Sequence, residues 1–157
     1  MNIRKAEVKD IGRIEELLSE VLEIHARIRP DIFISGTTKY TPSELEEIIK
    51  NENTPVFVAE DTSGAVVGYA FCIIKSQPFS TNMKNFKTLF IDDLCVDESC
   101  RGQHVGKSLW NFVLDYAKSL GCYDITLNVW EGNTPARTFY EKIGMSVKET
   151  QMEYIIK

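Results

Sequence analysis

The sequence has 157 residues, enough to bury a sizeable core within one domain. Hydrophobic residues make up 43% of it and charged residues 26%, and the formal net charge is −5. A net negative charge argues against a nucleic-acid binder, whose usual footprint is a basic face. The first residues lack a signal-peptide core, and no apolar run approaches the roughly 20 residues of a membrane span. We therefore expect a cytoplasmic protein of one domain, residues 1–157, with no nucleic-acid or membrane partner.

The cysteines and histidines do not suggest a metal site. Cys72, Cys95, Cys100 and Cys122 have no C-x-x-C spacing, and the only two histidines are scattered. In a reducing cytosol these cysteines are expected to be free thiols.

The N-terminal third predicts a short strand and two helices. `NIRKA` (2–6) is typical of a strand, and Asp10 is expected to cap a helix that ends before Pro30. `TPSE` (41–44) is a capping box with proline at the first helical position, and it begins a helix that ends near Asn51. The apolar residues at helical spacing in the first helix are Ile11, Ile14, Leu17, Leu18, Val21 and Leu22.

The middle of the chain predicts three strands. `PVFVAE` (55–60) and `AVVGYAFCIIK` (65–75) are joined by the turn `DTSG` (61–64) and should form a hairpin. A polar loop, `QPFSTN` (77–82), leads to the long apolar strand `KTLFIDDLCV` (87–96).

The last part predicts a helix over His104–Leu120, a buried-type strand `DITLNV` (124–129), a helix over 133–143 and a final strand `SVKETQMEYII` (146–156). The order β-α-α-β-β-β-α-β-α-β predicts an α/β fold: a mixed, mostly antiparallel, twisted sheet with helices on both faces. The strand–helix–strand crossover should make Leu94 and Ile125 neighbours in a parallel pair.

The stretch `CRGQHVGKSLW` (100–110) is close to the nucleotide-binding pattern G-x-x-x-x-G-K-[ST]. However, Gly102 and Gly106 are four residues apart rather than five, and this loop follows the fourth strand of a mixed sheet. A tight glycine turn into a helix N-terminus makes another kind of phosphate site, suited to a pyrophosphate. The amides expected to face it are those of Gln103, His104, Val105, Gly106 and Lys107.

Two stretches resemble signatures of the GNAT acetyltransferase superfamily. `CRGQHVG` resembles R/Q-x-x-G-x-G/A, with one departure: His104 stands where a glycine is usual. `NTPARTFYEKIGM` resembles N-x-x-A-x-x-F-Y-x-x-x-G-F, with Met145 in place of the usual aromatic residue. The residues that match are Arg101, Gln103, Val105, Gly106, Asn133, Ala136, Phe139, Tyr140 and Gly144.

The resemblance implies a GNAT-like sheet with a splayed parallel strand pair at the cofactor site, and acetyl-CoA as co-substrate. It implies that the backbone amide of Leu94 donates to the thioester oxygen and that Tyr140 gives a proton to the leaving sulfur. The cofactor-binding residues it implies are Leu94, Cys95, Val96, Arg101, Gly102, Gln103, His104, Val105, Gly106, Lys107 and Asn133.

Asp92 and Asp93 are the candidate bases. Two adjacent acids in an apolar strand are costly unless they are exposed or paired, and their side chains should point to opposite faces unless a bulge re-aims one. One reading is an exposed acid beside a salt-bridged one; the other is that the pair deprotonates the acceptor amine. Asp93 is favoured because it lies next to Leu94. The pair also resembles, locally, that of the polyamine acetyltransferases.

His25, Phe33 and Tyr40 are candidate substrate-binding residues, because the segment after the first helix usually forms part of the acceptor wall in this family. Trp130, at the end of `TLNVWEG` (126–132), is a candidate for the same wall. Three functions stay open: acetylation of a primary amine on a small molecule such as a polyamine or amino sugar, acetylation of a protein N-terminus or lysine, and acetyl-CoA binding without catalysis. The segment 11–51 and the loop 77–86 would cover a peptide groove, which favours a small acceptor. A homodimer is possible.

Overall fold

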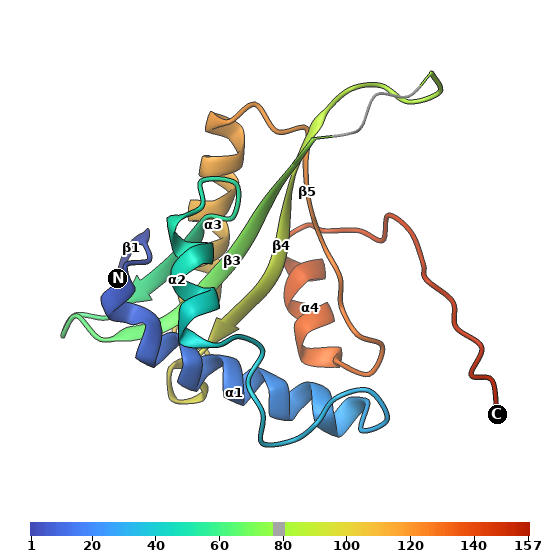
Figure 1. Ribbon diagram of the computed structural model, residues 1–157. Helices are drawn as coiled ribbons and strands as arrows, with labels where there is room; N and C mark the ends of the chain where they lie inside the picture. Colours follow the sequence, from blue (N-terminus) through green and yellow to red (C-terminus); the bar gives the residue numbers. More distant parts are fainter. Residues whose placement is uncertain (77–80) are drawn as a thin grey trace.

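A five-stranded sheet in the order β1-β2-β3-β4-β5 forms the centre of the computed structural model (Figure 1). All neighbours are antiparallel except β4 and β5, which are parallel, so the predicted mixed sheet is confirmed. The structure describes residues 1–76 and 81–157, and part of the expected loop 77–82 lies outside the described residues. The strands are β1 (Asn2–Lys5), β2 (Val56–Glu60), β3 (Val66–Ser76), β4 (Lys87–Val96) and β5 (Asp124–Leu127).

Helices cover both faces of this sheet (Figure 1). Apolar residues of α1 (Ile11–Ile28) and α2 (Pro42–Lys50) share one core with the sheet, and those of α3 (Val105–Ser119) share the core on the other face. The predicted capping box forms at the start of α2, where Thr41 accepts from the Glu44 amide at 3.2 Å. The fourth helix, α4 (Thr134–Lys142), lies on the α3 side. Within the described parts of the chain, no helix combines the length and apolarity needed to cross a membrane.

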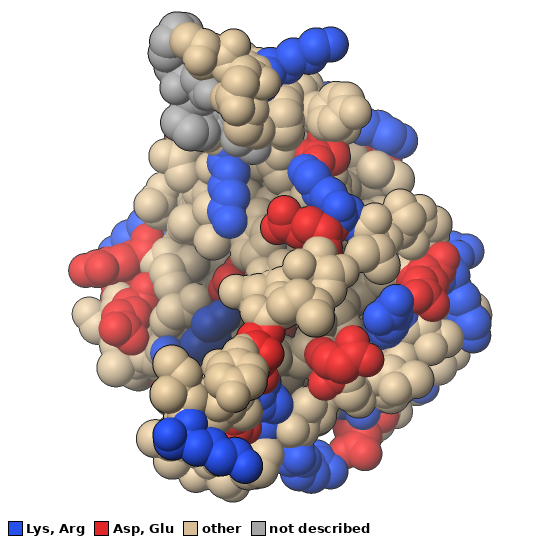
Figure 2. All heavy atoms as spheres, turned by 90° about the vertical axis from the view of Figure 1, so that its right-hand side faces the viewer, with Lys and Arg blue, Asp and Glu red and all other residues tan. Residues whose placement is uncertain are grey.

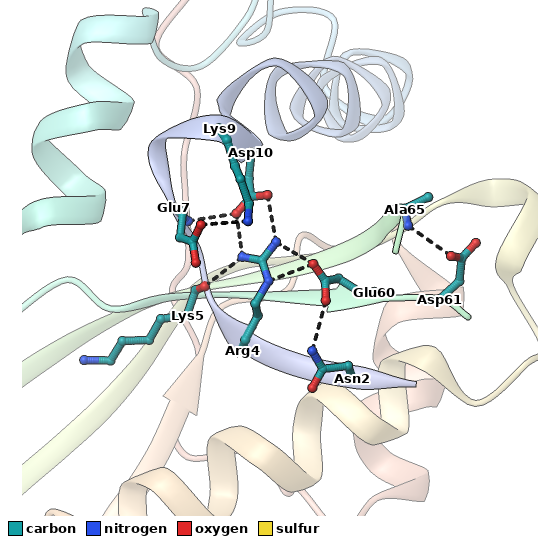
Figure 3. A network of polar contacts seen from close by, with 9 residues as sticks. All are labelled: Asn2, Arg4, Lys5, Glu7, Lys9, Asp10, Glu60, Asp61 and Ala65. Atoms are coloured by element: carbon teal, nitrogen blue, oxygen red, sulfur yellow. Dashed lines mark hydrogen bonds and ion pairs between the residues drawn. The ribbon is translucent and has the colours of Figure 1, made fainter. Parts of the chain in front are cut away.

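Asp10 holds β1 and β2 to the start of α1 instead of capping that helix with its side chain (Figure 3). Its carboxylate accepts from the Arg4 guanidinium at 2.7 and 2.9 Å and from the Glu7 amide at 2.8 Å. Arg4 also pairs with Glu60 of β2, at 2.6 Å. Asp10 is only 5% exposed, and these partners make the burial of its charge tolerable. The helix begins where predicted, but the expectation that Asp10 caps it was wrong, because the Asp10 side chain accepts no hydrogen bond from the first turn of α1.

The C-terminal segment departs most from the prediction. The expected strand 146–156 is wrong, because residues 145–157 form no helix or strand and run away from the sheet on the β5 side (Figure 1). β5 itself ends at Leu127, two residues before the predicted end. The apolar pattern of a strand is present in this segment, but a strand also needs a neighbour to satisfy its backbone groups.

Candidate active site

β4 and β5 separate part-way along their length. Their last pair is Ile91 with Leu127, and β4 then continues without a partner on that side. The expected pairing of Leu94 with Ile125 was wrong, because Ile125 lies opposite Leu89. A parallel pair that splays in this way leaves one edge of β4 open, from residue 92 to residue 96.

The backbone of Leu94 faces that open edge. Bonded and non-bonded residue pairs alternate along an antiparallel ladder. Because the Asp97 amide donates to the Val67 carbonyl at 2.8 Å, the pair of Leu94 with Ala70 falls among the non-bonded ones. The N–H and C=O of Leu94 therefore point away from β3 toward the open edge, and the N–H also interacts with the Asp93 carboxylate. Cys95, in contrast, is buried on the α1 side.

A β-bulge brings both candidate acids to the same face of the sheet. Asp93 lies opposite Phe71 and Ile91 lies opposite Cys72, so Asp92 is the extra residue in β4. The extra residue reverses the alternation of side chains at this point. Hence both carboxylates contact residues on the α1 and α2 side, and the bulge that the sequence analysis named as the exception to opposite faces is present.

Asp93 is a partly buried acid with an altered pKa. The Tyr69 hydroxyl donates to its carboxylate at 3.0 Å. Burial raises the pKa of Asp93 from 3.8 to about 6, against the opposing effects of Lys39, Tyr69 and the Leu94 amide. The carboxylate is therefore ionised at neutral pH yet close to the range in which a base exchanges protons readily.

Asp92 is held by the loop that precedes α2. Its carboxylate accepts from the Lys39 ammonium at 2.8 Å and from the Tyr40 hydroxyl at 3.3 Å. Sequence reasoning missed Lys39 and Tyr69. A tyrosine within the apolar run `VVGYAFC` was the available signal for Tyr69, because a buried hydroxyl needs a partner. Nothing in the sequence distinguishes Lys39 from other loop lysines.

Tyr140, on α4, lies near enough to Asp93 to sense its charge. Burial raises the pKa of Tyr140 well above its usual value, and the negative charge of Asp93 raises it further. The hydroxyl consequently keeps its proton at neutral pH, as a proton donor must. The preceding residue, Phe139, fixes α4 against α3, because a Cβ built on Gly106 would lie 3.3 Å from its ring.

The turn before α3 has the geometry of an anion site. His104 adopts a left-handed conformation with φ of 63°, which glycine adopts more readily, so histidine fills this place in the motif at some strain. The first bond into the helix runs from the Ser108 amide to the His104 carbonyl. The expectation for Gln103 was wrong, because its amide donates to Cys100 at 3.4 Å. Within the described residues, the backbone amides of His104, Val105, Gly106 and Lys107 at this helix start have no backbone acceptor.

Three of the four expected acceptor-wall residues lie together. Phe33 contacts His25 and Trp130, with ring centroids 5.2 and 5.4 Å apart. Tyr40 lies apart from them, stacked on Phe71 and bonded to Asp92. Burial lowers the pKa of His25, and the positive charge of Lys39 lowers it further. Lys39 therefore acts electrostatically on His25 while it also pairs with Asp92.

Asn133 acts as the N-cap of α4, where its side chain accepts from the Ala136 amide at 3.4 Å. The cap uses one side-chain oxygen, so a second role in holding pantetheine stays a prediction.

A family model described as the acetyltransferase (GNAT) family matches residues 18–145. The chain belongs to this family. The family generally uses acetyl-CoA, and the backbone amides at the start of α3 fit an anionic group such as its pyrophosphate.

Similar proteins include a glucosamine 6-phosphate N-acetyltransferase of Arabidopsis thaliana, 37% identical over 95 residues, or 60% of each chain. The match therefore spans less than two thirds of that relative. A solved structure of a mutant of the BH1408 protein of Bacillus halodurans is 31% identical, with a TM-score of 0.96 over 100% of both chains. A solved glucosamine-6-phosphate N-acetyltransferase of Arabidopsis thaliana is 26% identical, with a TM-score of 0.67 over 99% of this chain and 98% of that one.

Proposed function

We propose that this protein is an N-acetyltransferase that transfers the acetyl group of acetyl-CoA to a primary amine of a small molecule. One observation carries the proposal: the β4 bulge gathers Asp92 and Asp93 beside the backbone amide of Leu94, at the place where β4 and β5 separate. A base, a donor for a developing oxyanion and an open slot between strands are the parts that acyl transfer to an amine requires.

The acceptor amine carries a proton in much of its population at neutral pH, because the pKa of an alkyl ammonium lies near 10 and the oxygens of an amino sugar lower it only in part. Asp92 and Asp93 attract it, and Asp93 accepts a proton from it, directly or through water. Bound acetyl-CoA supplies the activated acetyl group. The Leu94 amide donates a hydrogen bond to the thioester oxygen, and Tyr140 gives a proton to the departing sulfur. The amides that begin α3, with Arg101 and Lys107 beside them, hold the pyrophosphate.

An amino sugar is the acceptor class that we propose first. The two Arabidopsis thaliana proteins named above carry glucosamine 6-phosphate in their names. The aromatic group of His25, Phe33 and Trp130 suits the apolar face of a sugar ring, and Arg29 lies 5.9 Å over the Trp130 ring as a cation close to the same wall. A linear polyamine would use the acids but little of this aromatic wall.

An acceptor panel tests the proposal. The full-length protein is incubated with acetyl-CoA and, separately, glucosamine 6-phosphate, glucosamine, spermidine, or a peptide with a free N-terminus and an internal lysine. Released CoA thiol is followed with a thiol reagent, and the products are identified by mass spectrometry. A reaction without acceptor corrects for hydrolysis and for the four free cysteines.

We expect thiol release with a small amine, highest kcat/KM for an amino sugar, and an acetamide product one acetyl group heavier. If kcat/KM is higher for the peptide than for every small amine, the acceptor would be a protein and not a small molecule. If the protein binds acetyl-CoA tightly but releases no CoA thiol with any acceptor, we would conclude that it is a binding module and not an enzyme.

A further inference from the structure

Lys39 places a primary amine beside the two candidate acids. Its side chain comes from the loop between α1 and α2, and its ammonium donates to the Asp92 carboxylate at 2.8 Å. The same positive charge acts on Asp93 and on His25, so the amine lies close to both the acids and the aromatic group of the proposed acceptor wall. This is the place where the proposed function puts the amine of an acceptor.

The Lys39 amine has room to move toward the position of the thioester. Its side chain is 43% exposed, and it carries the nitrogen on a flexible four-carbon stem. Leu94, whose amide is the proposed donor to the thioester oxygen, follows Asp92 by two residues in β4, which is about 7 Å along a strand. Rotations about the side-chain bonds of Lys39 can cover a distance of this order without a change in the backbone.

We propose that Lys39 is an acceptor in its own active site, and that the protein slowly acetylates this side chain once per chain. The inference rests on the proposed function, because it uses the same acetyl thioester, the same Leu94 amide and the same acids. It adds a covalent modification of the chain itself, at a residue that forms part of the site.

The reaction balances with groups already assigned to the site. The Lys39 ammonium gives one proton to Asp93, and its nitrogen lone pair then bonds to the thioester carbon. The carbon–sulfur bond breaks with its electron pair on sulfur, and the sulfur takes a proton from Tyr140. A second proton leaves the nitrogen and restores Tyr140 through water. The products are acetyl-lysine, the CoA thiol and one proton.

Pairing with Asp92 makes this reaction slow. Burial lowers the pKa of Lys39, but the hydrogen bond and the negative charge of Asp92 outweigh burial and raise the pKa above its usual value. The amine is therefore protonated at neutral pH and has to lose a proton before it can attack. We accordingly expect a single slow event and no repeated turnover.

Acetylation would change the charge of the site. An acetamide is neutral, so Asp92 would lose its ion pair and Asp93 would lose a positive charge that lowers its pKa. Both carboxylates would then be left without an internal cation that competes with a cationic acceptor.

Other lysines of the chain provide matched controls. Lys148 pairs with Asp124 at 3.0 Å and is 58% exposed, and Lys50 pairs with Glu46 and is 64% exposed. Lysine and arginine side chains are also spread over the surface of the face drawn in Figure 2, many of them beside acidic ones. Uncatalysed acetylation by a thioester depends on the exposure of the amine, so it would modify such lysines more than Lys39.

Mass spectrometry of the full-length protein tests the inference. The parent is incubated without an acceptor in acetyl-CoA that carries a deuterated acetyl group, and the label on each lysine is followed with time. We expect Lys39 to be labelled at least about tenfold faster than Lys148, because an amine held in the site reacts at a high effective concentration. Asp93→Asn should lose this excess while its acetyl-CoA affinity, measured by titration, stays at the parental value.

The CoA thiol released without an acceptor gives a second measurement. Above the hydrolysis background, the parent should release one equivalent per chain. Lys39→Arg should abolish this release, whereas Lys148→Arg should retain it. Equal labelling of Lys39 and Lys148, or labelling of Lys39 that persists in Asp93→Asn, would mean uncatalysed acetylation and would overturn the inference.

A mixture of two proteins shows whether the reaction occurs within one chain. Unlabelled parent is mixed with isotope-labelled Asp93→Asn, and the peptides that contain Lys39 are separated by mass. Lys39 of the variant should stay unmodified, and the rate in the parent should not depend on protein concentration. A modified variant chain, or a rate proportional to concentration, would show that one chain acetylates another, and the inference would be wrong.

This inference and the proposed function can fail separately. If small amines release CoA thiol but Lys39 gains no label above Lys148, only the inference is wrong. If Lys39 stays unlabelled and no amine releases thiol, both are wrong. Acetyl-Lys39 already present in the purified parent but missing from Asp93→Asn would support the inference, and its presence in both at the same level would contradict it.

Discussion

Asp93→Asn should stabilise the protein at neutral pH while lowering its activity. Asp93 carries a negative charge in a partly buried place beside Tyr69, where burial disfavours the charged form. Asparagine keeps a carbonyl oxygen that can accept from the Tyr69 hydroxyl, and it removes the charge. A residue that costs stability and supports turnover is the expected signature of a functional base.

The size of the effect follows from the pKa. A rise from 3.8 to about 6 is about two units, and at 1.36 kcal/mol per unit it corresponds to at most about 3 kcal/mol. Between these two pKa values the folded protein binds more protons than the unfolded one, so this residue's contribution to stability falls as pH rises. Below pH 3.8 the contribution vanishes, and above pH 6 the full cost is present.

Urea unfolding of parent and variant across this range is the assay. The free energy of unfolding of the variant minus that of the parent should grow by up to about 3 kcal/mol from about pH 3.5 to about pH 7.5. Asp92→Asn is the matched control: loss of its half-exposed ion pair with Lys39 should cost less than about 1 kcal/mol. A difference curve that stays flat for Asp93→Asn would refute the assigned burial cost, and unchanged kcat/KM at pH 7 would remove Asp93 from the mechanism.

Three further changes probe other parts of the site. Tyr140→Phe should retain acetyl-CoA affinity in a titration and lower kcat by about 10²–10³-fold, and parental turnover from pH 6 to pH 9 would make this tyrosine a packing residue. Lys39→Met removes a positive charge that lowers the pKa of Asp93, so the acidic limb of the kcat/KM profile should move to higher pH; a limb that stays in place would separate Lys39 from the base. His104→Gly should relieve backbone strain of about 1 kcal/mol at this left-handed position. The affinity for acetyl-CoA should not fall, because only the backbone amide of residue 104 is proposed to contact it. An increase in the acetyl-CoA Kd of tenfold or more would instead assign a role to the imidazole.

Local patterns in the sequence determined most of the helices and strands. The capping box at Thr41 and the glycine turn before Val105 act within a few residues, so both helix starts could be predicted. The two family signatures lie within short stretches as well, which is why the family and the place of Tyr140 could be inferred from sequence. Boundaries that depend on a neighbouring strand were less predictable, as the early end of β5 shows.

Only the tertiary structure decided how the acids are arranged. A bulge is a property of two paired strands, and no residue in `FIDDLCV` announces that Asp92 will be the unmatched one. The pKa of Asp93 also depends on the tertiary structure, because burial raises it, Lys39 in a loop and Tyr69 on β3 lower it, and the neighbouring Asp92 raises it. The segment 145–157 gives the clearest contrast. Its sequence has the apolar pattern of a strand, but a strand exists only where another strand supplies its hydrogen-bond partners, and the described part of the chain supplies none for these residues.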